Sequence, residues 1–296
     1  MLIDLHTHSA VSDGTDPPEV LVAAAARAGL SVLALADHDT TAGWAPARAA
    51  AARAGVRLVP AVEVSTRWQG GAVHLLALWP DDADPTLQQM LAGVRESRQE
   101  RVPRILDRLR ARGVPLLPAD VYRAAGEAVS VGRPHVADAL VAAGVVADRA
   151  EAFDSWLGEG RPAYVSKEAP DLPAAVRVVR AAGGVPVLAH PWGRGSRALL
   201  GPTALAQLAD VGLVGLEVDH VDHDPATRAE LRGWAERLGL LVTGGSDHHG
   251  AGKPGVALGQ EVTDPEAFAE LERARDRLRA ARVAAPAPAP GRSPAS

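Results

Sequence analysis

The hydrophobic pattern of the chain alternates between short apolar runs and longer Ala-rich or amphipathic segments. An apolar run opens the chain at Leu2, and later runs predict strands at residues 31–36, 57–64, 72–79, 185–189, 215–219 and from 241 onward. Between them the pattern predicts helices at 16–28 with Asp16 as cap, from Thr40 or Thr41 to near Gly55, and at 172–182, 203–211, 224–238 and 264–282. This alternation favours right-handed βαβ units, and seven strands favour a barrel with one strand fewer than eight.

Two parts of the chain depart from this alternation. The link between the third and fourth strands, at residues 68–71, is short enough for a hairpin, so this pair is expected to be antiparallel. Residues 84–160 show no strand pattern: they predict an Arg-rich helix over 86–112, bent at Pro103, and shorter helices near 119–125, 134–143 and 149–157. We therefore predict a barrel in two parts, residues 1–83 and 166–283, with a substrate-binding helical insertion at 84–165.

Composition limits what such a fold can do. The 296 residues are 47% hydrophobic, which suffices for one large core and a smaller second one. A formal net charge of −5 argues against a general nucleic-acid coat, and the absence of cysteine excludes disulfides and thiolate metal sites. No signal-like segment or membrane-spanning run is present, so we expect a cytoplasmic protein with no membrane partner and no obligate protein partner. The Ala-Pro tail, residues 284–296, is expected to be disordered.

Histidines and carboxylates recur where the predicted strands end. Because strand side chains alternate between faces, His6 and His8 project to the same side, where two imidazoles can share a metal ion. A single His-x-His is better explained by two polar residues at the end of a strand. The pattern recurs, however, in or after later apolar runs, and such residues gathered from across the chain suit a site at the carboxyl ends of parallel strands. The recurrences are Asp37-His38-Asp39, Glu63, His74, His190 and Asp247-His248-His249.

A candidate anion site lies in the predicted insertion. The stretch from Gly132 to His135 places the Arg133 guanidinium, backbone N–H groups and an imidazole at a helix start, which suits a phosphate. An ordinary helix entry with a surface arginine is the alternative. Lys167 and Lys253 are the only lysines among the 31 basic residues, so each is a candidate for an ammonium that faces a phosphate.

Two further histidines, His220 and His223, follow the predicted strand that carries Glu217. They could donate a proton to a leaving oxygen. The sequence favours the simpler interpretation, in which both are solvent-exposed loop residues.

The order His6-x-His8, Asp13, His38, Glu63, His74, His190, Asp247-x-His249 resembles that of the PHP family, named for polymerase and histidinol phosphatase domains. Within it the chain is most similar to small bacterial phosphoesterases with a helical insertion, which act on nucleoside 3′,5′-bisphosphates and on the 5′ ends of short RNAs. The resemblance implies a distorted (β/α)7 TIM-like barrel with up to three divalent ions at its mouth, Mn²⁺ first and Fe²⁺ or Zn²⁺ as alternatives. Many members have a histidine where this chain has Asp13, which would favour manganese or iron at that position.

The resemblance also implies a role for each residue. The first metal would be held by His6, His8, Glu63 and Asp247, the second by a bridging Glu63 with His74 and His190, and the third by Asp13, His38 and His249. The nucleophile would be a metal-bridging hydroxide held by Glu63, Asp247 and His190. Arg133, His135 and Lys167 would bind a second phosphate, which favours a small nucleotide or an RNA 5′ end as substrate. The alternatives are a histidinol-phosphate phosphatase, a metal-binding module without turnover, and a non-phosphate amidohydrolase.

Overall fold

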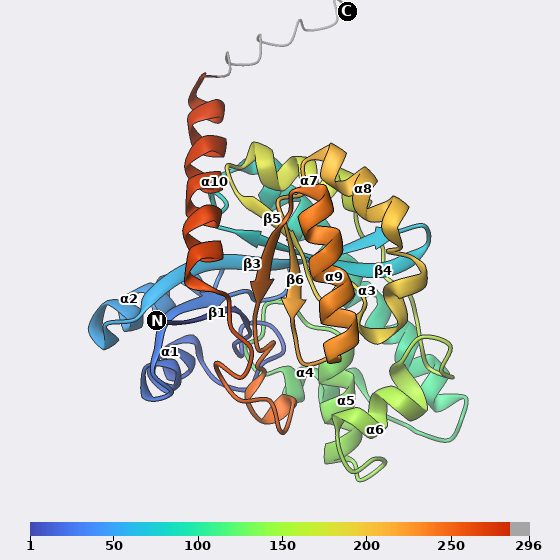
Figure 1. Ribbon diagram of the computed structural model, residues 1–296. Helices are drawn as coiled ribbons and strands as arrows, with labels where there is room; N and C mark the ends of the chain where they lie inside the picture. The colour runs from blue at the N-terminus through green and yellow to red at the C-terminus, as the bar shows by residue number, and fades with distance from the viewer. Residues whose placement is uncertain (285–296) are drawn as a thin grey trace, which may run out of the picture.

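The computed structural model describes residues 1–284, apart from the side chain of Arg194, and contains one seven-stranded sheet with helices packed around it (Figure 1). The strands lie side by side in chain order: β1 (Leu2–Thr7), β2 (Leu30–Leu35), β3 (Arg57–Trp68), β4 (Gly71–Leu78), β5 (Val185–Leu188), β6 (Gly215–Asp219) and β7 (Leu241–Gly244). Only β4 is antiparallel to its neighbours, and Trp68 pairs with Gly71 at the turn. The predicted α/β class and the antiparallel hairpin are therefore confirmed.

The two edges of the sheet approach each other without forming a continuous ladder. In the described part of the chain, a single parallel bridge joins Thr7 to His248, just beyond the end of β7. Around it the amide of Asp247 donates to the carbonyl of His6 at 2.8 Å, and the amide of His8 donates to the carbonyl of His248 at 2.9 Å. The strand pairing thus brings the ends of β1 and β7 together but does not confirm the closed barrel that was predicted.

The inward face of the sheet leads directly to the candidate site. Val59 and Ala61 of β3 pack with Leu76 and Leu78 of β4 in one buried cluster, which Phe268 of α10 (Pro265–Ala284) joins at its far end. Because strand side chains repeat every second residue, Glu63 continues the row of Val59 and Ala61. His74 continues the row of Leu76 and Leu78 in the same way. Regular alternation therefore places these two polar side chains together at one end of an apolar core.

Helices cover the outer face of the sheet. They are α1 (Pro18–Arg27), α2 (Trp44–Ala54), α7 (Leu172–Ala181), α8 (Pro202–Val211) and α9 (Pro225–Leu238), and their buried residues form a second cluster with the outward-facing strand residues. Two predicted helix starts are wrong. The N-cap of α1 is Pro17 rather than Asp16, and α2 begins after Gly43, because residues 37–43 form a loop in which the amide of Ala42 donates to Thr40 Oγ1.

The regular elements of the predicted insertion are all helices. It comprises α3 (Pro85–Arg110), α4 (Pro118–Ala125), α5 (Arg133–Ala142), α6 (Arg149–Ala152) and a π-helical turn, η1 (Phe153–Leu157). In Figure 1, α4, α5 and α6 lie together on the side toward which β6 points. Leu87 and Leu91 of α3 join the core of the sheet, whereas Ile105 and Leu109 join a separate core inside the insertion. The long helix α3 thus connects the two cores, and the domain boundaries themselves remain a prediction.

The predicted tail begins at Ala284, which is the last residue of α10. The rest of it, residues 285–296, lies outside the described residues. None of the helices that the structure describes is both long and apolar enough to span a bilayer.

Candidate metal centre

The predicted metal-ligating side chains converge where the strands end. Nitrogen and oxygen atoms within 4.8 Å of one another form three overlapping groups: His6, His8, Glu63 and Asp247; His38, Glu63 and His74; and His8, Asp13, His38 and His249. The remaining predicted ligand, His190, places Nε2 3.0 Å from Oε1 of Glu63. Residues from six separate stretches of sequence are thereby assembled into one site.

Glu63 lies at the middle of the assembly. Its Oε2 lies 3.1–3.4 Å from ring nitrogens of His6, His8 and His38. Its Oε1 lies 2.7 Å from Nδ1 of His74 and 3.0 Å from Nε2 of His190. Each carboxylate oxygen therefore faces a different set of imidazoles, which is the arrangement that a carboxylate shared by two metal ions requires.

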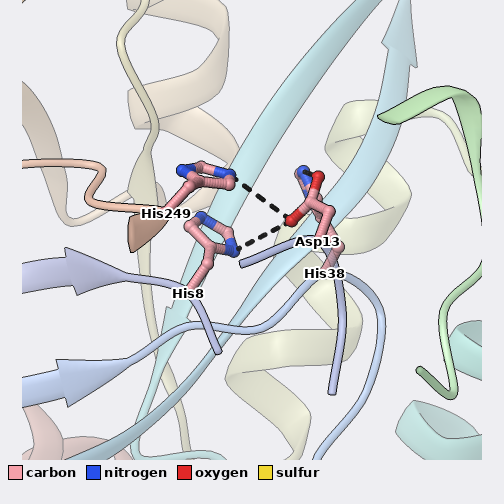
Figure 2. Close-up of side chains that lie close together, drawn as sticks. All are labelled: His8, Asp13, His38 and His249. Carbon is pink, nitrogen blue, oxygen red and sulfur yellow. Dashed lines mark ion pairs between the residues drawn. The ribbon is translucent and has the colours of Figure 1, made fainter. Parts of the chain in front are cut away.

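The group around Asp13 is shown in Figure 2, where the carboxylate points toward His8 and His249. Asp13 Oδ1 lies 3.4 Å from Nε2 of His249 and 3.7 Å from Nδ1 of His8, and Oδ2 lies 3.6 Å from Nε2 of His38. A tight turn presents this carboxylate: a Cβ on Gly14 would lie 2.5 Å from the carbonyl oxygen of His8. The close backbone approach leaves room only for glycine at this position.

Asp37, a buried carboxylate, holds the loop that carries Asp13 in place. Asp37 Oδ1 accepts hydrogen bonds from the amide of Ser9 at 2.8 Å and from the hydroxyl of Ser12 at 2.7 Å, and Oδ2 accepts one from the Ser9 hydroxyl. Asp37 itself is fully buried. The polar residues between His8 and Asp13 thus serve to hold Asp13 over the site.

The two oxygens of Asp247 have different neighbours. Oδ1 lies 3.3 Å from Nε2 of His8 and 3.5 Å from Nε2 of His6. Oδ2 lies 2.7 Å from the ammonium of Lys253 and 3.5 Å from Nε2 of His220. One oxygen is therefore directed to the cluster, while the other accepts a hydrogen bond from Lys253 and faces Nε2 of His220.

The structure corrects the interpretation of His220 and His223 as exposed loop residues. Their exposed fractions are 0% and 2%, because the chain turns back after β6. Nδ1 of His220 accepts a hydrogen bond from the amide of Asp222 at 3.0 Å, which leaves Nε2 as the protonated atom of a neutral ring. His220 therefore presents an N–H toward Asp247, and His223 is held by the Val218 carbonyl at 2.9 Å.

Glu217 of β6 was not identified from the sequence as a site residue. Its Oε1 lies 2.9 Å from Nδ1 of His6, and its Oε2 accepts a hydrogen bond from the amide of His190 at 2.8 Å. Burial alone would raise the pKa of this carboxyl, but the adjacent His6 lowers it to about 2. A carboxylate in the middle of an otherwise apolar strand was the available signal. Outer carboxylates of this kind commonly orient a histidine toward a metal.

The residues fit divalent metal ions. Burial would raise the pKa of Asp13, Glu63 and Asp247, yet the imidazoles around them hold all three pKa values well below the usual range. Nδ1 of His38 lies 3.1 Å from Oε2 of Glu63 without a hydrogen bond, and Nδ1 of His8 also has no hydrogen-bond partner. Lone pairs that converge without bonding to one another suit a shared cation, and nitrogen with oxygen donors suits Mn²⁺, Fe²⁺ or Zn²⁺.

A cavity of about 590 Å³ lies beside these residues. It is lined on one side by the strand ends, including His74 and His190, and on the other by the insertion, including Arg133 and Tyr164. The guanidinium of Arg133 lies 5.3 Å from the ring centroid of Tyr164. This cation–π contact keeps the charge of Arg133 at the wall of the cavity. The cavity thus joins the metal-ligating groups to a cation of the insertion.

The three predicted phosphate-binding residues have different positions. Arg133 lines the cavity, whereas His135 and Lys167 are not among its lining residues. Nδ1 of His135 accepts a hydrogen bond from the amide of Gly132 at 3.0 Å, and the Lys167 ammonium donates to Oγ of Ser65 at 2.8 Å. His135 therefore shapes the helix start that carries Arg133, and Lys167 contacts Ser65 of the strand that carries Glu63.

A family model and known proteins match this chain. A model of the PHP domain matches residues 4–106. The chain is 38% identical to the 3′,5′-nucleoside bisphosphate phosphatase of Chromobacterium violaceum over 262 residues, which cover 87% of this chain and 90% of the relative. It is 35% identical to the 5′-3′ exoribonuclease of Haemophilus influenzae over 248 residues, covering 83% and 89% of the two chains.

A solved structure extends the similarity to three dimensions. A Bifidobacterium adolescentis protein described as a metal-dependent phosphoesterase superimposes with a TM-score of 0.88 at 38% identity, covering 92% of this chain and 96% of the other. The similarity therefore includes the insertion as well as the sheet. Since relatives more than 30% identical are matched over most of their length, the chain belongs to the PHP family.

Proposed function

We propose that the chain is a metal-dependent phosphoesterase that hydrolyses phosphate esters of small nucleotides, either a nucleoside 3′,5′-bisphosphate or the 5′ end of a short RNA. The observation that carries this proposal is the cavity shared by the metal-ligating residues and Arg133. A phosphate ester needs cations to neutralise its charge, and a nucleotide with a second phosphate needs a cation beyond the metals. The relatives named for nucleoside bisphosphate and RNA hydrolysis support the same substrate class.

We assign the metal ligands as the sequence predicts them. His6, His8, Glu63 and Asp247 would hold one ion, Glu63 with His74 and His190 a second, and Asp13, His38 and His249 a third. Mn²⁺ is the proposed resident ion, with Fe²⁺ or Zn²⁺ as alternatives. When bound, ions held by Glu63, Asp247 and His190 would activate water and neutralise the charge on the phosphate. The proposed location is the mouth of a distorted barrel, and a cytoplasmic location also remains a proposal.

The residues around the ions would orient the substrate. Lys253 lies at the cavity with its ammonium on Asp247, close enough to meet a phosphate oxygen that enters there. Arg133 would bind a phosphate other than the one cleaved, and His135 would support it through the Gly132 amide. Lys167 would add positive charge beside Ser65. The substrate is thereby held at two phosphates, which fixes the reacting ester relative to Glu63.

A phosphate-release assay with Mn²⁺ tests this proposal. Adenosine 3′,5′-bisphosphate, a short 5′-phosphorylated RNA and histidinol phosphate would be compared, with Glu63→Gln as the control for contaminating phosphatases. We expect turnover of the bisphosphate, the RNA or both. Preference for histidinol phosphate would support the alternative phosphatase, and the absence of turnover in a protein that binds Mn²⁺ would support a module without catalysis.

A further inference from the structure

Arg149, the first residue of α6, links the insertion to the loop that carries Asp13. Its Nη1 donates a hydrogen bond to the main-chain carbonyl of Asp13 at 2.7 Å. Only 14% of the Arg149 side chain is exposed. Hydrogen bonds from charged donors are stronger than those from neutral donors, and a partly buried setting strengthens them further. Arg149 therefore restrains the backbone of Asp13 from the side of the insertion.

The guanidinium of Arg149 is itself held by a carboxylate of the insertion. Its Nε and Nη2 donate to the two oxygens of Asp138 in α5, each at 2.6 Å. In such a bidentate pair the two planar groups fix each other's orientation. Because Asp138 also neutralises the charge of Arg149, this side chain is better suited to holding its neighbours in position than to attracting an anion.

The same guanidinium approaches the loop that carries His249. A Cβ on Gly252 would overlap Nη1 of Arg149, so the backbone of this loop passes directly beside the guanidinium. The amide of Thr15 donates to the carbonyl of His249 at 3.1 Å, and the amide of Ala251 donates to Oγ1 of Thr15 at 2.9 Å. The two loops are thus joined to each other and to Arg149.

These two loops supply ligands of the third metal ion. Asp13 and His249, which with His38 form the third group of proposed ligands, lie beyond the ends of β1 and β7 (Figure 2). Glu63, by contrast, lies within β3. Side chains on loops are held less precisely than side chains on strands unless other groups support the loop. Arg149 provides such support to both loops.

We propose that Arg149 is a positioning residue that sets the affinity of the third metal ion. This inference rests on the proposed function, which assigns Asp13, His38 and His249 to that ion. Arg149 bonds to the carbonyl of Asp13 and not to its carboxylate, so it acts through the backbone and leaves the ligand atoms free. The insertion thereby helps to hold a metal ion in addition to lining the cavity.

Direct binding of a substrate phosphate is the competing role, because Arg149 also lines the cavity. The two roles predict opposite effects for Asp138→Asn, which keeps the size of the side chain and removes its charge. A positioning Arg149 would lose its support, so metal binding would weaken. A phosphate-binding Arg149 would gain free charge, so binding of the substrate would strengthen and metal binding would not change.

Metal titration tests the proposal without reference to hydrolysis. Wild type, Arg149→Met, Asp138→Asn and the control Arg123→Met would be dialysed against graded Mn²⁺ concentrations, and the bound metal counted. Arg123 is an insertion arginine that also pairs with a carboxylate, Asp120 at 2.9 Å, but its side chain is 75% exposed. One ion of Arg149→Met should require about 10- to 100-fold more Mn²⁺ than in the wild type, while the other ions bind normally. Asp138→Asn should shift the same ion in the same direction, and Arg123→Met should match the wild type.

Equal Mn²⁺ binding curves for wild type and Arg149→Met would overturn the inference, and so would unchanged metal binding with tighter substrate binding in Asp138→Asn. A lower Tm for Arg149→Met with an unchanged Mn²⁺ curve would also overturn it, since Arg149 would then support only the fold. If the wild type hydrolyses no nucleotide but Arg149→Met still binds one ion more weakly, the proposed function fails and the inference stands.

The Mn²⁺ dependence of turnover adds a second test for the active enzyme. With adenosine 3′,5′-bisphosphate as substrate, Arg149→Met should need about 10- to 100-fold more Mn²⁺ for half-maximal kcat/KM. At saturating Mn²⁺ its kcat and KM should approach the wild-type values, because the missing support is then offset by metal concentration. A KM for the bisphosphate that stays raised at saturating Mn²⁺ would assign Arg149 to the substrate and reject the positioning role.

Discussion

Nδ1 of His6 lies 2.9 Å from Oε1 of Glu217, and the other oxygen of Glu217 accepts a hydrogen bond from the amide of His190. A single buried carboxylate therefore contacts residues that we assign to two different metal ions. With Nδ1 protonated and bonded to Glu217, His6 presents the lone pair of Nε2 to the cluster. Glu217 is thus a positioning residue that fixes the ring of His6 and the backbone of His190 together.

Replacing Glu217 by Gln should weaken Mn²⁺ binding about 10- to 100-fold, the usual effect of losing a carboxylate that orients a metal-ligating histidine. The amide keeps the size of the side chain but removes the charge that holds His6. Metal content after dialysis against graded Mn²⁺ concentrations measures the effect, with the exposed Glu236→Gln of α9 as control. Equal metal retention by the two variants would show that Glu217 does not orient His6.

Asp247→Ala and Glu63→Ala should each lower kcat/KM by a factor of about 10²–10³ or more, the scale on which single charge-stabilising groups act in active sites. Both carboxylates are buried among imidazoles and take no part in the apolar core. The far-ultraviolet circular dichroism of both variants should therefore match that of the wild type. Turnover close to the wild-type rate by either correctly folded variant would refute the metal assignment.

Much of this site could be predicted from the sequence because its residues follow apolar strands. His38, Glu63 and Asp247 each follow or lie in an apolar run, and the carboxyl ends of parallel strands meet at one edge. The hairpin between β3 and β4 was also predictable, since residues 68–71 leave no room for a crossover. What these features share is that local spacing alone determines where the side chains lie.

The other functional groups depend on contacts that the local pattern does not encode. Glu217 stands out as a carboxylate in a buried strand, but its role depends on a contact with His6, which lies 211 residues away in the sequence. Arg133 begins α5, and its place on the cavity wall depends on how the insertion packs beside the strand ends, which the helical pattern does not specify. His220 was interpreted as exposed because the turn after β6 that buries it has no distinctive sequence.

The stability of the protein should fall as the pH drops below about 6.5, partly through His223. Burial lowers the pKa of this imidazole, and the hydrogen bond to the Val218 carbonyl offsets the effect only in part. The folded state therefore keeps His223 neutral while the unfolded chain takes up a proton near pH 6.5, so stability present above that pH is lost below it.

Chemical denaturation of wild type and His223→Gln at pH 5 and pH 8 measures this contribution. The stability advantage of the wild type over the variant should be smaller at pH 5 by up to about 2 kcal/mol, because one protonation contributes about 1.4 kcal/mol per pH unit. The difference between the two proteins isolates His223 from the other titrating groups. An advantage that is independent of pH would mean that His223 is protonated in the folded state as well.

The turn at Gly14 provides a test of how the third group is held in place. A Cβ there would lie 2.5 Å from the carbonyl oxygen of His8, so Gly14→Ala must displace the loop that carries Asp13. We expect a loss of stability of about 1–3 kcal/mol, typical of overpacking, together with a lower metal content. Gly93→Ala in α3 is the control, because a Cβ at that position would have no neighbouring atom within 4 Å and alanine favours a helix by about 1 kcal/mol. In urea denaturation, Gly14→Ala should be less stable than the wild type and Gly93→Ala more stable. Metal analysis should show a loss of metal only in Gly14→Ala. Full metal content in Gly14→Ala would show that Asp13 reaches the site without the tight turn.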